Sequence, residues 1–189
     1  LADEIVPVSL PQRKGDPIVV ETDEGVRPGT TAGSLGKLRA AFLDDGTITA
    51  GNASQISDGG SALVMMSERA AAACGVEPLG EVVSYGMVAG PDNPSLNLQP
   101  SNAIRKALSK TDLDVGDVSL FELNEAFAAV GIASSRDLGI SLDVVNVNGG
   151  AIALGHPIGM SGNRLALTLI HELRRRGGGI GAAALCGGG

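Results

Sequence analysis

From residue 79 onwards, short apolar runs alternate with helix-forming segments, and this alternation restricts the fold more than any other feature of the chain. The runs expected to be strands are 81–85, 118–121, 144–147 and 180–185, and the segments expected to be helices are 101–108, 125–138 and 161–176. A β-α-β-α-β-α-β order requires a sheet covered by helices. The sequence therefore predicts an α/β fold for this region.

The segment 161–176 carries the clearest helical pattern. Four apolar residues fall on one helical face: Leu165, Leu169, Ile170 and Leu173. Three arginines at 174–176 follow in the last turn, and Gly177 ends the segment. A patch that binds nucleic acid or coenzyme A (CoA) is one interpretation of the arginines. We favour a structural one, because positive charge stabilises the carbonyl end of a helix.

The composition restricts the core and the partners. Hydrophobic residues make up 43% of the 189 residues and aromatic residues only 2%, so the core must consist of Ala, Val, Leu and Ile. The formal net charge of −7 argues against a protein that binds nucleic acid or a membrane surface, because phosphates attract basic surfaces. No apolar run reaches the roughly 18–20 residues of a membrane span.

The region before residue 79 has a different character. Residues 1–56 are rich in Gly, Pro, Asp and Thr, which predicts loops. Ser57 and Asp58 give an N-cap signal ahead of the helix expected at 62–73, and Gly75 follows its end.

The two cysteines, Cys74 and Cys186, are too few for the disulfide framework of a small secreted domain. We therefore expect a reducing compartment, the cytoplasm. The first residues contain no signal-like segment. The chain starts at Leu1 without an initiator Met, so an organelle stays open as an alternative.

His156 is the first candidate for chemistry. It lies in a glycine-rich turn, between Gly155 and Pro157, ahead of the helix expected at 161–176. Glycine allows close approach to a ligand, and the N-terminus of a helix presents free N–H groups to oxygen atoms. The other histidine, His171, lies inside that helix and is expected to be an ordinary helical residue.

Cys186 is the second candidate, because it ends an expected strand and three glycines follow it. Backbone amides beside such a thiol are natural donors to an oxyanion. Cys74 follows four alanines at a helix end and is expected to pack as a small hydrophobic residue. Asn124 has two interpretations: it caps the following helix, or its amide holds a water or a substrate oxygen.

Taken together, these segments resemble the thiolase family, acetyl-CoA acetyltransferases in particular. The residues that carry the resemblance are 124–128 (NEAFA), 146–159 (NVNGGAIALGHPIG) and 186–189 (CGGG), together with 49–54 and 57–59. It covers essentially the whole chain. It implies a layered α/β fold with two similar halves, each a mixed sheet covered by helices, and a loop domain that holds CoA.

Within that fold, the resemblance implies three parts. Residues 1–56 would be the end of the CoA-binding loop domain, residues 57–78 the last helix of the N-terminal half, and residues 79–189 the C-terminal domain without its final strand. The cysteine that becomes acylated would lie upstream, in an N-terminal half that this chain lacks. Assembly as a homodimer or homotetramer is expected.

The family's catalytic roles carry over to four residues. By resemblance, His156 takes the proton of the acylated cysteine and Cys186 removes a proton from the α-carbon of a second acetyl-CoA. His156 and a water held by Asn124 would stabilise one oxyanion, and the amide of Gly188 would help to bind the other. The product would be acetoacetyl-CoA.

Four further residues are expected to meet the substrate, an acyl-CoA thioester. Ser54 resembles the family's contact to the pantetheine arm and Arg27 a basic residue near the nucleotide, while Ala126 and Phe127 would line the acyl pocket. The resemblance implies no covalently bound cofactor and no metal.

Alternatives stay open for the substrate and for the role of the chain. Residues 97–101 (NLQPS) depart from the Gly-Pro pair of many biosynthetic thiolases, so the pocket wall near Leu96 differs and a degradative thiolase for longer 3-ketoacyl-CoA stays open. A non-catalytic CoA-binding fragment is another alternative. Ketoacyl synthases share the fold but use two histidines, or His with Asn, and Cys186 argues against them.

Overall fold

The computed structural model describes residues 3–90 and 96–187. Its strands are β1 (Val8–Leu10), β2 (Ile18–Val20), β3 (Leu120–Leu123) and β4 (Gly181–Ala184). Its α-helices are α1 (Ala32–Leu35), α2 (Glu68–Cys74), α3 (Gln99–Leu108), α4 (Ala128–Leu138), α5 (Ala151–Leu154) and α6 (Ile158–Arg175), with 3-10 turns at Val115–Asp117 and Leu142–Val144.

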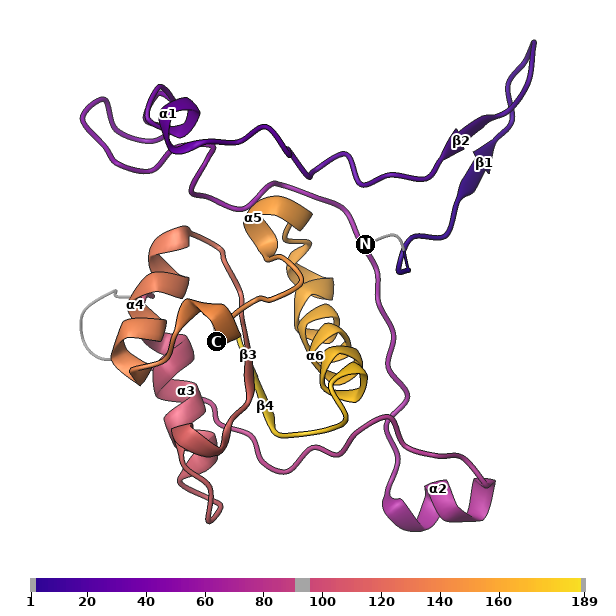
Figure 1. The fold of residues 1–189 in the computed structure, drawn as a ribbon, viewed down its shortest axis with the longest axis vertical. Helices are drawn as coiled ribbons and strands as arrows, with labels where there is room; N and C mark the ends of the chain where they lie inside the picture. Colours follow the sequence, from indigo (N-terminus) through magenta and orange to yellow (C-terminus); the bar gives the residue numbers. More distant parts are fainter. Residues whose placement is uncertain (1–2, 91–95, 188–189) are drawn as a thin grey trace.

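Two parallel strands, β3 and β4, lie at the centre of the C-terminal region, with Leu120 opposite Gly181 and Leu123 opposite Ala184. Helices α3 and α4 cover one face of these strands and α6 covers the other (Figure 1). The α/β class predicted from the sequence is confirmed.

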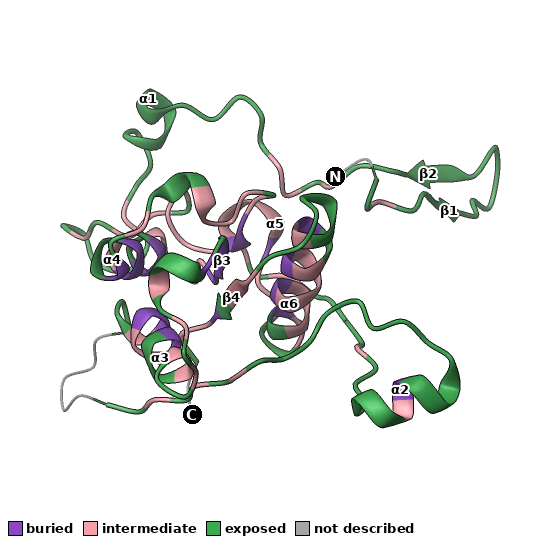
Figure 2. Cartoon of the chain, turned by 60° about the horizontal axis from the view of Figure 1, so that its bottom comes forward, coloured by how far each residue is buried: buried purple, intermediate pink, exposed green. Residues whose placement is uncertain are grey.

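The core fills the layer between the strands and the helices α3 and α4. Its buried residues are aliphatic apart from one phenylalanine: Ile104, Val118, Phe121, Leu123, Leu138 and Ala184. On the other face, Leu169 of α6 lies so close to Gly181 that a Cβ there would come within 2.7 Å of the leucine side chain. Buried residues accordingly gather on the sides of β3, β4, α3, α4 and α6 that face one another (Figure 2).

The helices predicted at 101–108 and 161–176 are confirmed, each with an earlier start. In α6, Leu165 and Leu169 are buried, as the predicted apolar face requires. Two of the arginines, Arg175 and Arg176, form ion pairs with the buried Glu172, which supports the structural interpretation of that cluster.

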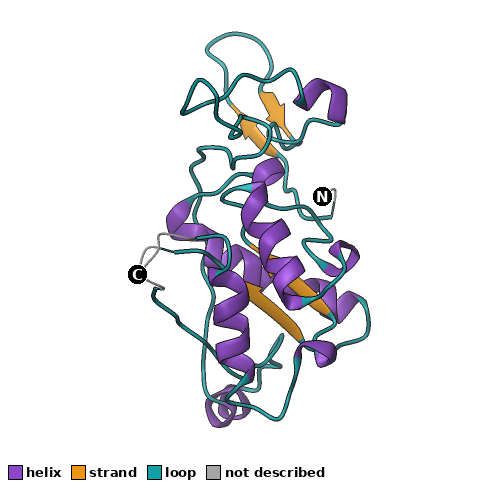
Figure 3. Cartoon of the chain, turned by 90° about the vertical axis from the view of Figure 1, so that its left-hand side faces the viewer, coloured by secondary structure: helices purple, strands orange, loops and turns teal. Residues whose placement is uncertain are grey.

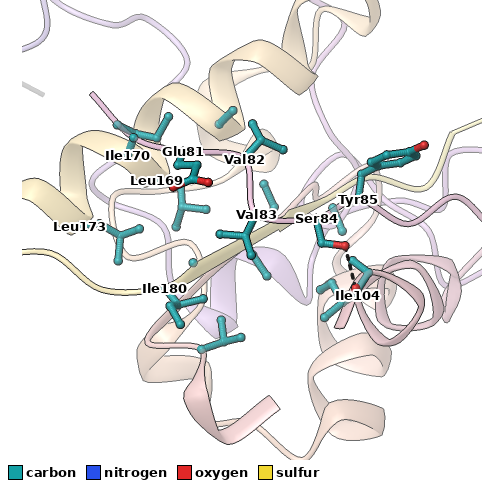
Figure 4. Close-up of a pocket in the computed structure, with 18 of the residues that line it drawn as sticks. Glu81, Val82, Val83, Ser84, Tyr85, Ile104, Leu169, Ile170, Leu173 and Ile180 are labelled. Carbon is teal, nitrogen blue, oxygen red and sulfur yellow. Dashed lines mark hydrogen bonds between the residues drawn. The ribbon is translucent and has the colours of Figure 1, made fainter. Parts of the chain in front are cut away.

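The strand predicted at 81–85 is wrong. This segment is extended but pairs with no strand among the described residues. Ser84 Oγ donates to the carbonyl of Ala107 in α3, and beside this contact the segment, β4, α3 and α6 together line a cavity of about 580 Å³, with Val83, Leu169 and Ile180 among its apolar residues (Figure 4). Apolar patterning predicts which residues turn inward, but a strand also needs a hydrogen-bonding neighbour.

The strand predicted at 144–147 is also wrong. Ser141 accepts a hydrogen bond from the Asp143 amide and starts the 3-10 turn Leu142–Val144. Only Val145 then pairs with β3, through one parallel bridge to Phe121. Asn146 has a φ of 48°, which lies outside the β region, so the chain does not continue as a strand there.

Two predicted helix starts were wrong. Helix α2 begins at Glu68 with Ser67 as its N-cap, not near Ser57 and Asp58, because the preceding residues run along α6; for example, Ser61 Oγ donates to the carbonyl of Met160. Its end at Gly75, with a φ of 64°, is as predicted. Helix α4 begins at Ala128 instead of 125.

Residues 3–67 are loop-rich, as expected, with one hairpin (β1–β2) and one helical turn (α1). All six hairpin residues are exposed. The hairpin and α1 project away from the layered region (Figures 1 and 3).

Candidate active site

The imidazole of His156 is held at both ring nitrogens. Its Nε2 lies 3.0 Å from Nδ2 of Asn124, and its Nδ1 lies 2.6 Å from Oγ of Ser161. Asn124 and Ser161 are fully buried, whereas His156 is partly exposed. The structure thus brings two of the predicted site residues into direct contact and fixes the orientation of the ring.

The turn between α5 and α6 positions His156. Gly155 has a φ of 91°, and a Cβ there would lie 2.2 Å from Oγ of Ser57. The His156 amide donates to the carbonyl of Gln55 at 3.3 Å. Glycine is therefore needed at 155 for both its conformation and its small size.

Asn124 directly follows the carboxyl end of β3. Its backbone N–H donates to the carbonyl of Ala184 in β4 at 3.0 Å. The N-cap of α4 is Phe127, so the capping interpretation of Asn124 is wrong. The buried Oδ1 of Asn124 has no hydrogen-bond partner among the described residues, which leaves an acceptor for a water or a substrate group.

Cys186 follows β4 by two residues. Because β3 and β4 are parallel, Asn124 and Cys186 emerge at the same edge of the strands. The Cys186 thiol is half-buried, and burial raises its pKa. No hydrogen bond joins it to His156 within the part of the chain that the structure describes. The predicted donor Gly188 lies outside the described residues.

Cys74 lies at the end of α2, where it is exposed. The prediction that it packs as a small hydrophobic residue is wrong, because α2 turns only Ala71 inward. His171 is exposed on α6, in keeping with an ordinary helical residue.

A buried pair of charges lies beneath the site. Arg164 Nη1 is 3.9 Å from Oε2 of Glu122. Burial raises the pKa of Glu122 to about 7, although the charge of Arg164 opposes the shift. Burial, and then the charge of Arg164, lower the pKa of His156. Both effects favour the neutral imidazole, the state that a general base requires.

The segment predicted to meet CoA is joined to the connection between β3 and α4. Ala53 pairs with Phe127 through an antiparallel bridge, and the Ser54 amide donates to the carbonyl of Ala126 at 3.0 Å. The three predicted contacts Ser54, Ala126 and Phe127 thus lie side by side, and all are partly exposed. Their roles toward a ligand stay predictions.

Gln55 ties this segment to α5. Its Nε2 lies 3.2 Å from the carbonyl oxygen of Gly25, 3.0 Å from that of Ile152 and 2.9 Å from that of Ala153. Arg27, the fourth predicted contact, follows Gly25 by two residues and is exposed. The structure does not bring Arg27 into contact with His156.

Residues 3–90 and 96–187, which the structure describes, contain no group of three or more His, Cys, Asp or Glu side chains that could hold a metal ion. Within the same ranges, no helix combines the length and the apolar character that a membrane crossing demands.

Comparison with known proteins identifies the family. Residues 76–189 match the model of the thiolase C-terminal domain, and residues 1–69 match that of the thiolase N-terminal domain. The chain belongs to the thiolase family. The predicted boundaries at 56 and 78 stay predictions, although the matched ranges also divide the chain near residue 70.

Thiolase relatives extend well beyond this sequence. The chain is 56% identical over 188 residues to the "Probable acetyl-CoA acetyltransferase" of Mycolicibacterium smegmatis, covering 100% of this chain and 48% of that protein. It therefore spans about half the length of the curated relatives it matches.

Solved thiolase structures have the same fold. The Bacillus anthracis acetyl-CoA acetyltransferase superposes with a TM-score of 0.87 at 46% identity, covering 97% of this chain and 46% of that one. Human mitochondrial 3-ketoacyl-CoA thiolase in complex with CoA gives 0.83 at 45% identity, covering 89% and 42%. The thiolase-like layered fold predicted from the sequence is confirmed.

Three polar residues that organise this candidate site were not predicted from the sequence. Ser161 contacts the His156 ring, and Gln55 holds α5 in place. Glu125 accepts from Asn146 Nδ2 at 2.7 Å and from the Ile152 amide at 3.2 Å. A glutamate one residue after Asn124 and a serine five residues after the histidine were visible signals, but nothing in either spacing shows what the side chain contacts.

Proposed function

We propose that the complete polypeptide is an acyl-CoA C-acyltransferase that joins two acetyl-CoA molecules to form acetoacetyl-CoA and CoA, or catalyses the reverse thiolysis. This chain supplies the His, Cys and Asn side of the site. One observation carries the proposal: His156 is in hydrogen-bond contact with Asn124, at the strand edge from which Cys186 also emerges.

In the first half-reaction, a cysteine outside these 189 residues attacks the thioester carbonyl of one acetyl-CoA. The thiol replaces the Asn124 N–H at the lone pair of His156 Nε2, and its proton passes to that nitrogen. A sulfur–acyl bond forms, the acyl–CoA bond breaks, and the proton on Nε2 passes to the departing CoA thiolate.

In the second half-reaction, the Cys186 thiol passes its proton to His156, and the resulting thiolate removes a proton from the α-carbon of a second acetyl-CoA. The raised pKa of this thiol makes its thiolate a stronger base than a thiolate in water. Negative charge gathers on the thioester oxygen, where protonated His156 and a water bound to Asn124 stabilise it. The carbanion then attacks the acyl-enzyme carbonyl, the bond from the acyl group to the nucleophilic cysteine breaks, and the departing thiolate takes the proton from His156.

The CoA thioester is the substrate, and Ser54, Arg27, Ala126 and Phe127 are its proposed contacts. Support comes from the antiparallel bridge that places Ser54 beside Ala126 and Phe127, near the β3 edge. The similar human thiolase is described as a complex with CoA. Gly188 is proposed as the second oxyanion donor.

Acyl-chain length separates two thiolase activities. Acetyl-CoA acetyltransferases are among the relatives, but the similarity to human 3-ketoacyl-CoA thiolase keeps longer substrates as a second candidate. The test measures cleavage of acetoacetyl-CoA and of a long-chain 3-ketoacyl-CoA by the complete enzyme. We expect the larger kcat/KM for acetoacetyl-CoA, and a strong preference for the long chain would reverse our choice.

A non-catalytic CoA-binding fragment is the alternative of a different class. Neither cysteine of the 189-residue chain is the expected nucleophile. Cys186 is proposed as the base, and Cys74 lies on α2, apart from α5 and α6 (Figures 1 and 2). We expect no turnover of acetoacetyl-CoA by this chain alone, and turnover once the N-terminal half is added. Activity of the chain alone would show that the nucleophile is not outside it.

Assembly and compartment follow as proposals. Large apolar side chains are exposed outside the layered region, including Phe42 (72%) and Met65 (76%), which supports contact with the N-terminal half and association as a homodimer or homotetramer. We propose the cytoplasm as the compartment, because the Cys186 thiol must stay reduced to act as a base.

A further inference from the structure

Ser161 is fully buried in the first turn of α6, next to the functional histidine. Its Oγ lies 2.6 Å from Nδ1 of His156 and 2.9 Å from the carbonyl oxygen of Pro157. The backbone positions the hydroxyl firmly, because the Ser161 amide also donates to the Pro157 carbonyl at 2.9 Å. This serine has no part in the reaction sequence described above.

The directions of three hydrogen bonds follow from what each atom can do. Nδ2 of Asn124 can only donate, so Nε2 of His156 must accept and carries a lone pair. A neutral imidazole then has its proton on Nδ1, which donates to Oγ of Ser161. The serine hydroxyl has one proton, and it goes to the carbonyl of Pro157.

We propose that Ser161 is a positioning residue that holds His156 in the Nδ1–H tautomer, with the basic lone pair of Nε2 on the side of Asn124. The hydroxyl acts as a neutral relay between the imidazole and the Pro157 carbonyl. Ser161 thus has the role of the acid in a nucleophile–histidine–acid triad, which orients the histidine. Unlike that acid, the serine hydroxyl carries no charge.

The relay also serves the protonated state of the ring. Once Nε2 has taken a proton, both ring nitrogens are donors. Nδ1 keeps its acceptor in Ser161, and Nε2–H is then directed toward the oxyanion. The catalytic consequence of this role of Ser161 rests on the proposed function. The tautomer of His156 itself can be measured independently of activity.

The test measures the tautomer of His156 in the complete enzyme, labelled with ¹⁵N in its histidines. Long-range ¹H–¹⁵N correlation spectra distinguish Nδ1–H from Nε2–H, and the spectrum of His156→Gln assigns the signal. We expect Nδ1–H in the unmodified protein and a clear gain of the Nε2–H form in Ser161→Ala. The same variant should lose about 10- to 100-fold in kcat, less than the loss of a charged orienting group.

Two variants make the experiment specific. Ser161→Thr keeps the hydroxyl and should restore both the Nδ1–H signal and most of the activity. Ser101→Ala is the matched control: it is also a fully buried helical serine that donates to a backbone carbonyl, that of Leu98 at 2.9 Å, and it should change neither readout.

The outcomes separate this inference from the proposed function. An unchanged Nδ1–H signal in Ser161→Ala, or a threonine variant that folds but behaves like alanine, overturns the role of Ser161. Full activity of His156→Gln overturns the proposed role of the histidine as a base, whatever the spectra show. Thermal unfolding of each variant shows whether the fold is intact.

Discussion

The two parts of this chain are held in different ways. Around His156, side-chain hydrogen bonds join the ring to Asn124, 32 positions earlier, and to Ser161, and both of these partners are fully buried. The loop-rich part before α2 exposes its hairpin and meets the layered region mainly through residues 52–61. The site is therefore held by the layered region, and the loop part is attached to it at a short stretch of chain.

His156→Ala in the complete enzyme tests the layered side of this comparison and should have the largest effect. Removal of a positioned acid–base group costs about 10²–10⁴-fold, and the loss of an oxyanion donor adds to it. Steady-state kcat for acetoacetyl-CoA cleavage is the measurement. His171→Ala, at an exposed position of α6, is the control and should retain full activity.

Cys186→Ala should lower kcat by about 10²–10⁴-fold as well, because the carbon acid loses its base. Acylation of the enzyme by acetyl-CoA should continue, since that step uses His156. Cys74→Ala, at an exposed position of α2, should leave turnover nearly unchanged. If Cys74→Ala instead abolishes turnover and Cys186→Ala does not, the two cysteine assignments must be exchanged.

Gln55→Ala tests the attachment between the two parts. The substitution leaves the carbonyls of Gly25, Ile152 and Ala153 without this donor, so the free energy of unfolding should fall by about 1–3 kcal/mol.

Denaturant unfolding of the complete enzyme measures the effect of Gln55→Ala. The matched control is Gln12→Ala, whose amide also donates to a carbonyl, that of Leu10, but at an exposed site where water can replace it. Equal stability of the two variants would mean that Gln55 does not attach the loop part to α5.

Glu122→Gln tests the buried charge pair through its pH dependence. In the unfolded chain the carboxyl ionises near its ordinary pKa of 4.5, whereas in the folded protein burial raises this pKa to about 7. The contribution of Glu122 to stability is therefore fully present below pH 4.5 and is lost as the pH rises to about 7.

The Glu122→Gln variant should not show this loss of stability with rising pH. Its free energy of unfolding at pH 8 should exceed that of the unmodified enzyme by about 1 kcal/mol, because the attraction to Arg164 is lost together with the larger cost of burying the charge. Unfolding measured at pH 5 and pH 8 gives the difference. Glu21→Gln, at an exposed position, should leave the pH dependence unchanged.

Sequence patterns predicted helices better than strands in this chain. Helix α6 carries its own signal, because its apolar face and its arginine-rich end are local. The segment 81–85 has the composition of a strand but lacks a paired neighbour, and 144–147 gives way to a turn started by Ser141. Strand formation depends on what lies alongside, and local sequence does not contain that information.

The candidate site divides in a similar way. His156, Cys186 and Asn124 stand out by residue type and by neighbouring glycines or strand ends, so each could be selected from the sequence. The contact between His156 and Ser161 could not, although the two are five positions apart. It depends on α6 starting at Ile158 rather than near Ser161, which places the serine within the first turn, beneath the ring.

The sequence by itself determined the α/β class and the family, and it showed which residues can carry proton transfer, because residue type and local periodicity are properties of short segments. Only the tertiary structure decided that Asn124 donates to His156 rather than capping α4, and that Ser54 lies beside Ala126. These contacts arise from parallel pairing of β3 with β4 and from packing between segments distant in the chain. Both are long-range interactions, whose geometry is set by the whole fold.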